Sequence, residues 1–450
     1  MMSKFDGKRL DKNVFQMDVE RLRKGWYSDK YFCNNVLLLE TLAKENYTFQ
    51  GESDIKEIDC TIVKNGDLEV EMQIFTRRQP FSLVAGIDEA LALLEECTGY
   101  YDEDDHFVNT YDQLEIEAVH DGTFVTYDGN PKNVKPILKI RGKYTYFAKL
   151  ETPILGVVAV PTRIATNVFN TLVASQSKEI LFFPARFDHY KTQALHGYSY
   201  SIAIQAYNEK YENKNCRFVS TDEQGAWWGG AGGGTIAHAS ICCFFGDTAE
   251  TMMQFSRIMP VEVSRIALID FHNDCVGDTL KVMKRMFEKY CELYKDGNYV
   301  EAKKYKLFAV RPDTSGNMRD TSVIPIGDKS LDMGVNPRLI WNLRKAIDHA
   351  WQGWDCARVG TISQMAKEWC SEVKIVVTGG FNAAKINKFE ELRVPVDIYG
   401  VGSSLLENSN ETNNDFTADI VRVKLYDQKW HDMAKIGRCP CDNPDLVRIQ

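Results

Sequence analysis

Apolar residues follow both helical and strand-like spacing in the first third of the chain. Over residues 36–44 and 85–100 they recur as on one face of a helix, whereas residues 68–74 (LEVEMQI) alternate as a strand does. Short alternating runs return over residues 114–125, which is typical of a small antiparallel sheet. The pattern predicts one α+β domain over residues 1–150.

Short apolar runs alternate with helical segments in the remainder of the chain. The runs occupy residues 180–183, 266–270, 307–310, 374–377 and 396–399. Helical spacing follows the first four of these runs, over residues 193–207, 278–294, 338–351 and 382–392. Doubly buried strands that alternate with helices indicate a parallel sheet. The pattern therefore predicts an α/β domain over residues 151–409, either a barrel or a doubly wound sheet.

Polar or glycine-rich residues follow the predicted strands. They are Pro184-Ala185-Arg186, Ser220-Thr221-Asp222, Gly234-Thr235-Ile236-Ala237-His238, Asp270, Arg311-Pro312-Asp313, Thr378-Gly379-Gly380 and Gly400-Val401-Gly402-Ser403. Active sites of α/β folds lie at the carboxyl ends of the strands, and a closed ring would let all these residues converge. We therefore favour an α/β barrel, a fold whose usual length is about 250 residues.

Composition narrows the classes of function. The 450 residues are 44% apolar and 26% charged, as in ordinary globular proteins, and the net charge of −9 argues against a general nucleic-acid binder. No run of about 18 apolar residues occurs, and the N-terminus MMSKFDGKRLDKN lacks the apolar core of a signal peptide, so we expect a cytoplasmic protein without membrane contact. The 12 cysteines, including Cys439 and Cys441, lack the paired spacing of a zinc site and are interpreted as free thiols.

Glycine turns follow the last two predicted strands. Gly379-Gly380 leads into a predicted helix, and Gly400 and Gly402 follow the next strand. Backbone N–H groups that glycine leaves uncovered at a helix start bind phosphate well. Such turns can also serve only to join a strand tightly to a helix, but the last strands of α/β barrels are a recurrent phosphate site. The two turns therefore predict a phosphate-binding site.

Charged residues at the same strand ends predict the rest of the chemistry. Asp270 and Asp313 suit a magnesium ion and sugar hydroxyls, and their alternative role is to cap the next helix. Arg186 and Arg311 suit a carboxylate or phosphate, or an internal ion pair with those aspartates. His238 is a candidate for proton or phosphoryl transfer, and otherwise a core histidine.

Six segments of the chain resemble, in order, motifs of nicotinate phosphoribosyltransferase, a type II phosphoribosyltransferase related to the nicotinamide and quinolinate enzymes. They are Tyr27–Phe32 (YSDKYF), Phe183–Arg186 (FPAR), Gly234–His238 (GTIAH), Arg311–Thr314 (RPDT), Val377–Asn382 (VTGGFN) and Asp397–Ser403 (DIYGVGS). Each motif is weak alone, but the six occur in the right order and span nearly the whole chain.

The resemblance implies a fold and an activity. The fold is an irregular α/β barrel over residues 151–409 with an N-terminal α+β domain that residues 410–450 complete, in a head-to-tail homodimer with shared active sites. The activity is transfer of phosphoribose from phosphoribosyl pyrophosphate to nicotinate, which gives nicotinate mononucleotide and pyrophosphate for NAD salvage. Mg²⁺ is the implied cofactor, and ATP is the implied co-substrate.

The resemblance also implies which residues bind the substrates. Tyr31 of the neighbouring subunit and Phe183 would stack on the two faces of the pyridine ring, and Arg186 would hold its carboxylate or a neighbouring phosphate. The other substrate-binding candidates, with the glycines assigned to the 5′-phosphate, are Thr235, Gly379, Gly380, Gly400, Gly402 and Ser403.

The catalytic residues implied by the resemblance are four. His238 matches the histidine that ATP phosphorylates, and Asp270 and Asp313 would organise magnesium and ribose, with Arg311 beside them. The chain departs from the motifs of the nicotinate enzymes at Asp222. Nicotinamide-using relatives carry an acidic residue near this position, which accepts the amide group of nicotinamide. Two alternatives therefore stay open, which are transfer to nicotinamide and a non-catalytic barrel that binds phosphorylated metabolites.

Overall fold

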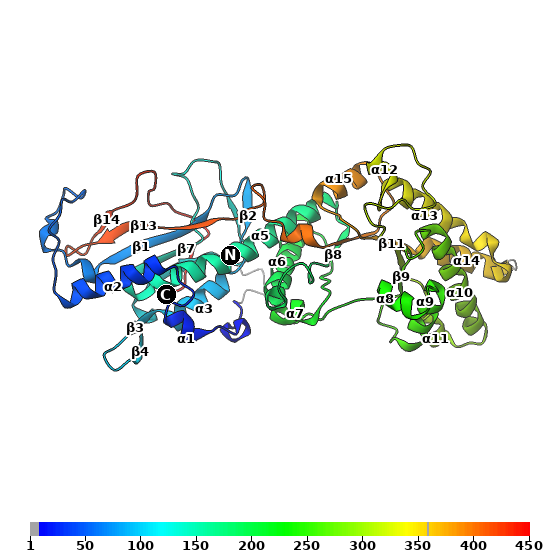
Figure 1. Cartoon of the computed structure of the whole chain (residues 1–450), viewed down its shortest axis with the longest axis horizontal. Coiled ribbons are helices and arrows are strands. Elements are labelled where there is room, and N and C mark those ends of the chain that lie inside the picture. The colour runs from blue at the N-terminus through cyan, green and yellow to red at the C-terminus, as the bar shows by residue number, and fades with distance from the viewer. Residues whose placement is uncertain (1–8, 358–359) are drawn as a thin grey trace. The chain divides into compact units, whose positions relative to one another are not determined.

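The computed structural model describes residues 9–357 and 360–450 (Figure 1). Its α-helices are α1 Val19–Arg23, α2 Lys30–Lys44, α3 Ile87–Cys97, α4 Tyr144–Phe147, α5 Glu151–Ala174, α6 Gln193–Tyr211, α7 Asp222–Gly225, α8 His238–Cys243, α9 Thr248–Ile258, α10 Cys275–Lys295, α11 Tyr299–Lys303, α12 Lys329–Asp332, α13 Pro337–His349, α14 Gly360–Glu372 and α15 Ala383–Glu391. Its strands are β1 Glu69–Thr76, β2 Phe81–Leu83, β3 Gly99–Tyr101, β4 Phe107–Asn109, β5 Glu115–Ala118, β6 Phe124–Thr126, β7 Leu138–Lys143, β8 Glu179–Phe182, β9 Ile266–Leu268, β10 Ala309–Arg311, β11 Lys374–Val377, β12 Ile398–Val401, β13 Phe416–Lys424, β14 Trp430–Asp432 and β15 Val447–Arg448. The first eight residues, on which part of the signal-peptide prediction rests, lie outside the described residues.

The chain forms two compact units whose bounds differ from the predicted 1–150 and 151–409. The N-terminal unit comprises the residues up to Phe169, Tyr198–Lys210 and Glu407–Gln450, and the barrel-side unit comprises Asn170–Gly197 and Tyr211–Leu406. The first boundary falls later than predicted because Ile154 and Val158 of α5 belong to the apolar core of the N-terminal unit.

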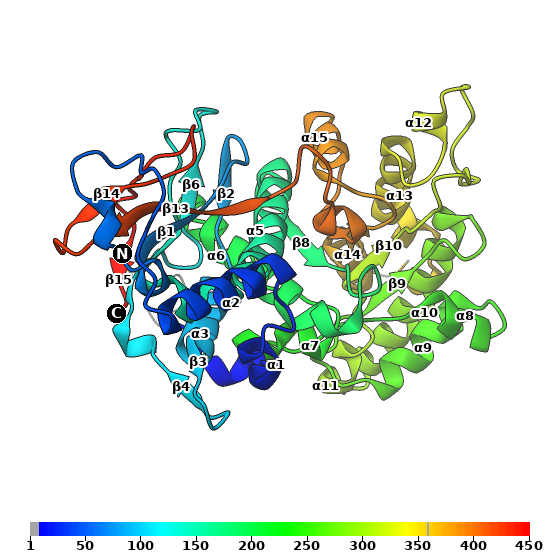
Figure 2. The ribbon, with the colours of Figure 1, turned by 60° about the vertical axis from the view of Figure 1, so that its left-hand side comes forward.

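The N-terminal unit is built on a six-stranded sheet that joins distant parts of the chain. Its strand order is β14-β13-β1-β7-β5-β15, and every pair is antiparallel. The central strand β1 pairs on both sides, and Figure 2 shows β13 running beside it. In the register of these pairs, Val70 lies between Gly142 of β7 and Val423 of β13. The last segment of the chain therefore supplies three of the six strands of this sheet.

Helix α5 is a core element that the sequence pattern did not predict. Apolar residues cover most of its circumference, and Pro161 lies inside it, where proline removes one hydrogen bond of the helix. By length and composition the segment Tyr144–Ala174 could cross a membrane, contrary to the prediction that no such helix exists. Within the protein, 56% of its most apolar window is buried, as expected of a core helix.

The barrel-side unit contains a parallel sheet in the order β8-β12-β11-β10-β9. Isolated parallel bridges from Phe182 to Val219 and from Val219 to Gly232 extend it beyond β8. Within the described part of the chain, no strand pair joins β9 to Gly232 and closes the ring. The predicted α/β class is confirmed, and the pairing is that of an irregular rather than a regular barrel.

One apolar residue from each of the five parallel strands contributes to a buried layer. These residues are Leu181, Ile266, Ala309, Val376 and Ile398. Phe183 and Phe218 pack against the layer and are only partly buried. Residues at successive strand ends lie next to this layer, because parallel strands bring their carboxyl ends to one edge of a sheet.

Candidate active site

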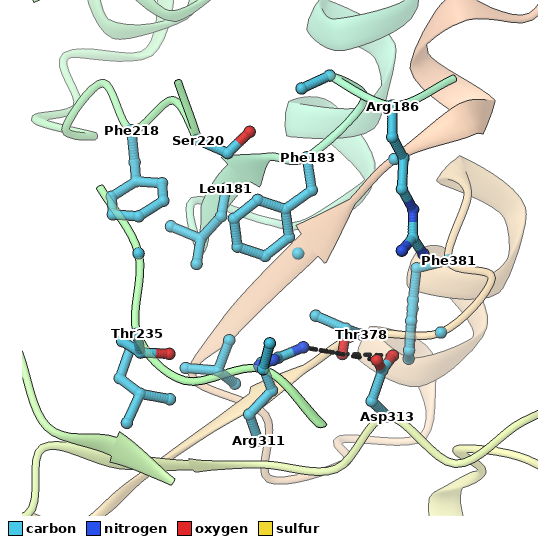
Figure 3. Close-up of a pocket in the computed structure, with 18 of the residues that line it drawn as sticks. Leu181, Phe183, Arg186, Phe218, Ser220, Thr235, Arg311, Asp313, Thr378 and Phe381 are labelled. Carbon is cyan, nitrogen blue, oxygen red and sulfur yellow. Dashed lines mark hydrogen bonds and ion pairs between the residues drawn. The ribbon is translucent and has the colours of Figure 1, made fainter. Parts of the chain in front are cut away.

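A pocket of about 480 Å³ lies at the carboxyl ends of the parallel strands (Figure 3). It is lined only by residues of the barrel-side unit. Eleven predicted site residues line it: Phe183, Arg186, Thr235, His238, Arg311, Asp313, Gly379, Gly380, Gly400, Gly402 and Ser403. Residues from widely separated parts of the sequence therefore meet in one cavity, as the strand-end pattern predicted.

The interior of the pocket is apolar and aromatic. Leu181, Ile266 and Val376 form part of its lining. The rings of Phe183 and Phe218 meet edge to face, with centroids 6.0 Å apart, and Figure 3 shows the Phe183 ring projecting into the space between Phe218 and Arg186. A flat aromatic ligand can stack in such a space while polar groups at its edge fix its orientation.

Arg311 is held at one wall of the pocket by three polar contacts. Its guanidinium lies 3.5 Å from the Asp313 carboxylate and donates hydrogen bonds to the Thr378 hydroxyl and the Ile236 carbonyl. The Thr378 hydroxyl donates to Asp313 at 2.7 Å. Burial lowers the pKa of Arg311. The carboxylates of Asp313 and Asp270 raise this pKa, and the positive charge of Arg186 lowers it further. Two arginines therefore act on the same site, which favours an anionic ligand.

Asp270 and His238 form a hydrogen-bonded pair. His238 Nε2 and Asp270 Oδ1 are 2.9 Å apart, with the histidine side chain 48% exposed and the aspartate side chain 9% exposed. Burial raises the pKa of Asp270, which His238 lowers and Asp313 raises further. Asp270 does not line the pocket, but it forms a hydrogen bond with His238, which does. A buried carboxylate that orients a solvent-accessible imidazole prepares it for proton or phosphoryl transfer.

The two glycine turns have geometry that side chains would disrupt. Gly379 and Gly380 have φ values of 91° and 69°, in the left-handed region. A Cβ on Gly400 would lie 2.7 Å from the Phe183 ring and 2.6 Å from the Thr378 methyl group. Glycine at these positions thus lets the backbone approach the cavity and a ligand in it.

The pair Asp270 and Asp313 is compatible with a magnesium ion that a substrate brings. Asp313 raises the pKa of Asp270, so the carboxylates feel each other's charge. Among the described residues no group of three or more His, Cys, Asp and Glu side chains could form a complete protein cage for a metal. Mg²⁺ commonly takes one or two carboxylates and fills its remaining positions with phosphate oxygens and water. The residues present fit that arrangement.

Besides Asp270, two residues from the sequence analysis, Tyr31 and Asp222, do not line the pocket. Tyr31 belongs to the N-terminal unit, where it is 58% exposed and its hydroxyl lies 3.3 Å from Asp29. Asp222 accepts a hydrogen bond of 2.9 Å from the N–H of Gly232, and the lining includes Ser220 instead. Asp222 therefore anchors the glycine loop beside the pocket in this structure.

Several lining residues were absent from the predicted site. The most prominent are Phe187, Phe218, Ser220, Thr378 and Phe381. Thr378, Phe381 and Ser220 lie within or beside the predicted strand-end segments, so the signal was present although it pointed to no particular role. Phe187 directly follows Arg186 and so lies beside such a segment too. Phe218 carried no such signal, because an isolated aromatic residue is equally typical of a core.

Comparison with known proteins supports the fold seen here. Residues 57–161 match the family "Quinolinate phosphoribosyl transferase, N-terminal domain". The structure of nicotinate-nucleotide pyrophosphorylase from Pyrococcus furiosus is similar over 93% of this chain and 79% of its own, at 22% identity and a TM-score of 0.61. Human nicotinic acid phosphoribosyltransferase is similar over 88% and 74%, at 13% identity and a TM-score of 0.53. No curated protein sequence matches the chain.

Proposed function

We propose that this chain, which has the fold of the type II phosphoribosyltransferases and their N-terminal domain, is a phosphoribosyltransferase of NAD biosynthesis whose acceptor is nicotinate. One observation carries the proposal. A single pocket combines two glycine turns, two arginines and an aromatic interior. This set of groups matches a phosphate, a carboxylate and a flat ring, which are the parts of nicotinate and phosphoribosyl pyrophosphate.

The reaction moves the ribose C1 from pyrophosphate to the ring nitrogen of the base. The turns at Gly379-Gly380 and Gly400-Gly402 would hold the 5′-phosphate, and Phe183 would stack on the pyridine ring. Positive charge develops on the ribose while the C1–oxygen bond breaks, so preorganised charges lower the barrier. A bound Mg²⁺ would neutralise pyrophosphate, with Asp270 and Asp313 as its protein ligands.

Arg186 supports nicotinate over nicotinamide as the acceptor. It lines the pocket, and its guanidinium lies over the Phe187 ring, 5.4 Å from the centroid. A planar guanidinium bonds a carboxylate with charge-assisted hydrogen bonds that a neutral amide lacks. Asp222, the residue that favoured nicotinamide, has its carboxylate on the Gly232 N–H.

His238 supports coupling of the transfer to ATP. A neutral imidazole is a good nucleophile near pH 7, and the His238 Nδ1 edge is opposite the nitrogen that contacts Asp270. Its attack on the γ-phosphorus of ATP would form an N–P bond and release ADP. Hydrolysis of that bond would return phosphate and free histidine after transfer. The new negative charge would lie beside the glycine loop 229–234 during the cycle.

A homodimer would complete the site. Around Tyr31, the helices α1 and α2 and the turn between them expose large apolar side chains, which include Trp26, Tyr27, Leu37 and Leu38. Clustered exposed apolar groups are typical of a protein interface. We propose that this surface contacts a second copy and delivers Tyr31 to the partner's pyridine site, in a cytoplasmic enzyme.

Product analysis tests the proposal. Nicotinate, nicotinamide and quinolinate are offered separately with phosphoribosyl pyrophosphate and Mg²⁺, with and without ATP, and mononucleotides are separated by chromatography. We expect nicotinate mononucleotide as the main product, with ATP increasing its yield. Faster conversion of either other base would reassign the acceptor. Tight binding of phosphoribosyl pyrophosphate without any turnover would favour the non-catalytic barrel.

A further inference from the structure

Lys385 lies directly behind the first glycine turn of the pocket. It is in the first turn of α15, and its backbone N–H is capped by the side chain of Asn382. Its ammonium group donates a hydrogen bond of 3.3 Å to the carbonyl of Gly379. The same group lies 4.2 Å from the centroid of the Phe381 ring, and Phe381 lines the pocket.

The Lys385 ammonium lacks a carboxylate partner among the residues that the structure describes. Its surroundings are the Gly379 carbonyl and the rings of Phe381 and Phe389. Burial is the one cause that acts on its pKa and lowers it to about 8. A partly desolvated cation without a counterion is stabilised by an anion that arrives nearby.

The contact with Gly379 fixes one peptide group of the turn. The carbonyl of Gly379 and the N–H of Gly380 belong to the same planar trans peptide, in which they point in opposite directions. None of the hydrogen bonds formed between described residues uses the Gly380 N–H. Gly380 lines the pocket, so this donor is available to a ligand there. Without an external contact, two consecutive glycines would let this peptide rotate readily.

We infer that Lys385 is a positioning residue for the substrate phosphate: its ammonium holds the Gly379 carbonyl so that the Gly380 N–H faces the 5′-phosphate of phosphoribosyl pyrophosphate. Its positive charge polarises the shared peptide and strengthens the N–H as a donor. The charge also adds to the attraction of the phosphate dianion at the start of α15. This inference rests on the proposed function, because it needs a phosphorylated substrate in the pocket.

Substitution of Lys385 should affect binding of phosphoribosyl pyrophosphate more than binding of nicotinate. In Lys385→Met, we expect the KM for phosphoribosyl pyrophosphate to rise about 10-fold or more, as for loss of one charge-assisted hydrogen bond. The KM for nicotinate should change less than about twofold, since Lys385 contacts Gly379, Phe381 and Phe389 rather than Phe183, the ring assigned to the pyridine. Lys385→Arg keeps a cation and should restore most of the affinity. The matched control is Lys388→Met, which removes an exposed lysine of the same helix.

The pH dependence supplies a readout that a merely structural role would not change. In the wild-type protein, deprotonation of Lys385 should weaken phosphoribosyl pyrophosphate binding as the pH rises above about 8. Lys385→Arg should remove this decline, because arginine stays charged throughout that range. A decline of equal size in the arginine variant would overturn the inference, and so would equal KM values for wild type and Lys385→Met. If the methionine variant does not fold, the arginine profile alone decides.

Direct binding distinguishes failure of this inference from failure of the proposed function. Isothermal titration measures the affinity of each variant for phosphoribosyl pyrophosphate and for ribose 5-phosphate without turnover. If the wild-type protein binds neither compound, the proposed function fails. If it binds both and Lys385→Met binds them equally well, the function stands and the role of Lys385 is wrong.

Discussion

The two arginines of the pocket, Arg311 and Arg186, differ in how firmly their guanidinium groups are held by neighbouring residues. Arg311 is fixed by Asp313 and Thr378, whereas the Arg186 guanidinium lies over the Phe187 ring, 5.4 Å from its centroid. The fixed arginine is suited to a permanent role in the site. The less constrained one is suited to a ligand that comes and goes.

Replacement of Arg186 tests its assignment to the acceptor carboxylate. Arg186→Met should reduce kcat/KM for nicotinate roughly 10- to 100-fold, which corresponds to a charge-assisted hydrogen bond of about 1.5–3 kcal/mol. Turnover of nicotinamide should fall much less, so the preference between the bases narrows. Steady-state kinetics with both bases measure the change, and Arg257→Met, on the exposed surface of α9, is the control. Equal losses with both bases would show that Arg186 binds phosphate instead.

His238 and His272 form a natural comparison. Both side chains are about half exposed, at 48% and 49%, and each has an aspartate at 2.9 Å, but only His238 lines the pocket. Incubation with Mg-ATP should place an acid-labile, base-stable phosphate on His238. His238→Ala should abolish ATP hydrolysis and retain a slow, ATP-independent transfer.

Mass spectrometry of the phosphorylated peptide and release of ADP follow this reaction. His272→Ala should keep both signals, because it removes a similar hydrogen bond between histidine and aspartate at a residue outside the pocket lining. ATP hydrolysis that persists unchanged per folded molecule of His238→Ala would refute the assignment.

Among the secondary-structure elements, the start of α3 depends on a buried carboxyl group. The helix begins after Gly86, which offers no capping side chain, and Asp121 accepts a hydrogen bond from the Ile87 N–H instead. The other Asp121 oxygen accepts a bond from the Tyr198 hydroxyl at 2.7 Å. Burial, reinforced by Asp88, raises the pKa of Asp121 to about 7.

This shift predicts the pH dependence of stability. Between about pH 4 and 7 the folded protein holds a proton on Asp121 that the unfolded chain has lost, so the free energy of unfolding decreases as the pH rises through this range. Asp121→Asn should flatten the dependence by up to about 1.4 kcal/mol per pH unit. Urea unfolding at several pH values measures it, with exposed Asp112→Asn as the control. An unchanged slope in Asp121→Asn would exclude this carboxyl as the source.

For the molecule as a whole, the proposed dimer predicts complementation. Tyr31→Ala and Asp313→Ala should each be inactive alone, because one lacks the ring delivered to the partner and the other lacks a residue of its own pocket. Mixed after subunit exchange, they should regain activity through hybrid dimers that contain one intact site. Native mass spectrometry establishes that exchange occurs. No recovery in mixtures that contain hybrids would show that Tyr31 does not act across the dimer.

Local elements and the residues at the strand ends could be predicted from the amino-acid pattern. The strand Lys374–Val377 has the bounds that its apolar run predicts, and the glycine turns after β11 and β12 line the pocket as expected. Periodicity reveals such features because each depends on neighbours within a few positions. The motif at Arg311–Thr314 likewise marks a polar strand end, since it directly follows an apolar run, and Arg311 is the last residue of β10.

The packing partners of these helices and strands could not be predicted from the sequence and were decided by the tertiary structure. Helix α5 was not predicted, and its burial comes from a core to which distant strands contribute. Asp222 and Lys385 both lie near glycine loops in sequence, yet Asp222 accepts a hydrogen bond from the Gly232 N–H, and Lys385 donates one to the Gly379 carbonyl. Hydrogen-bond partners and desolvation depend on the surrounding chain in three dimensions, so a one-dimensional pattern can nominate charged residues but cannot assign their contacts.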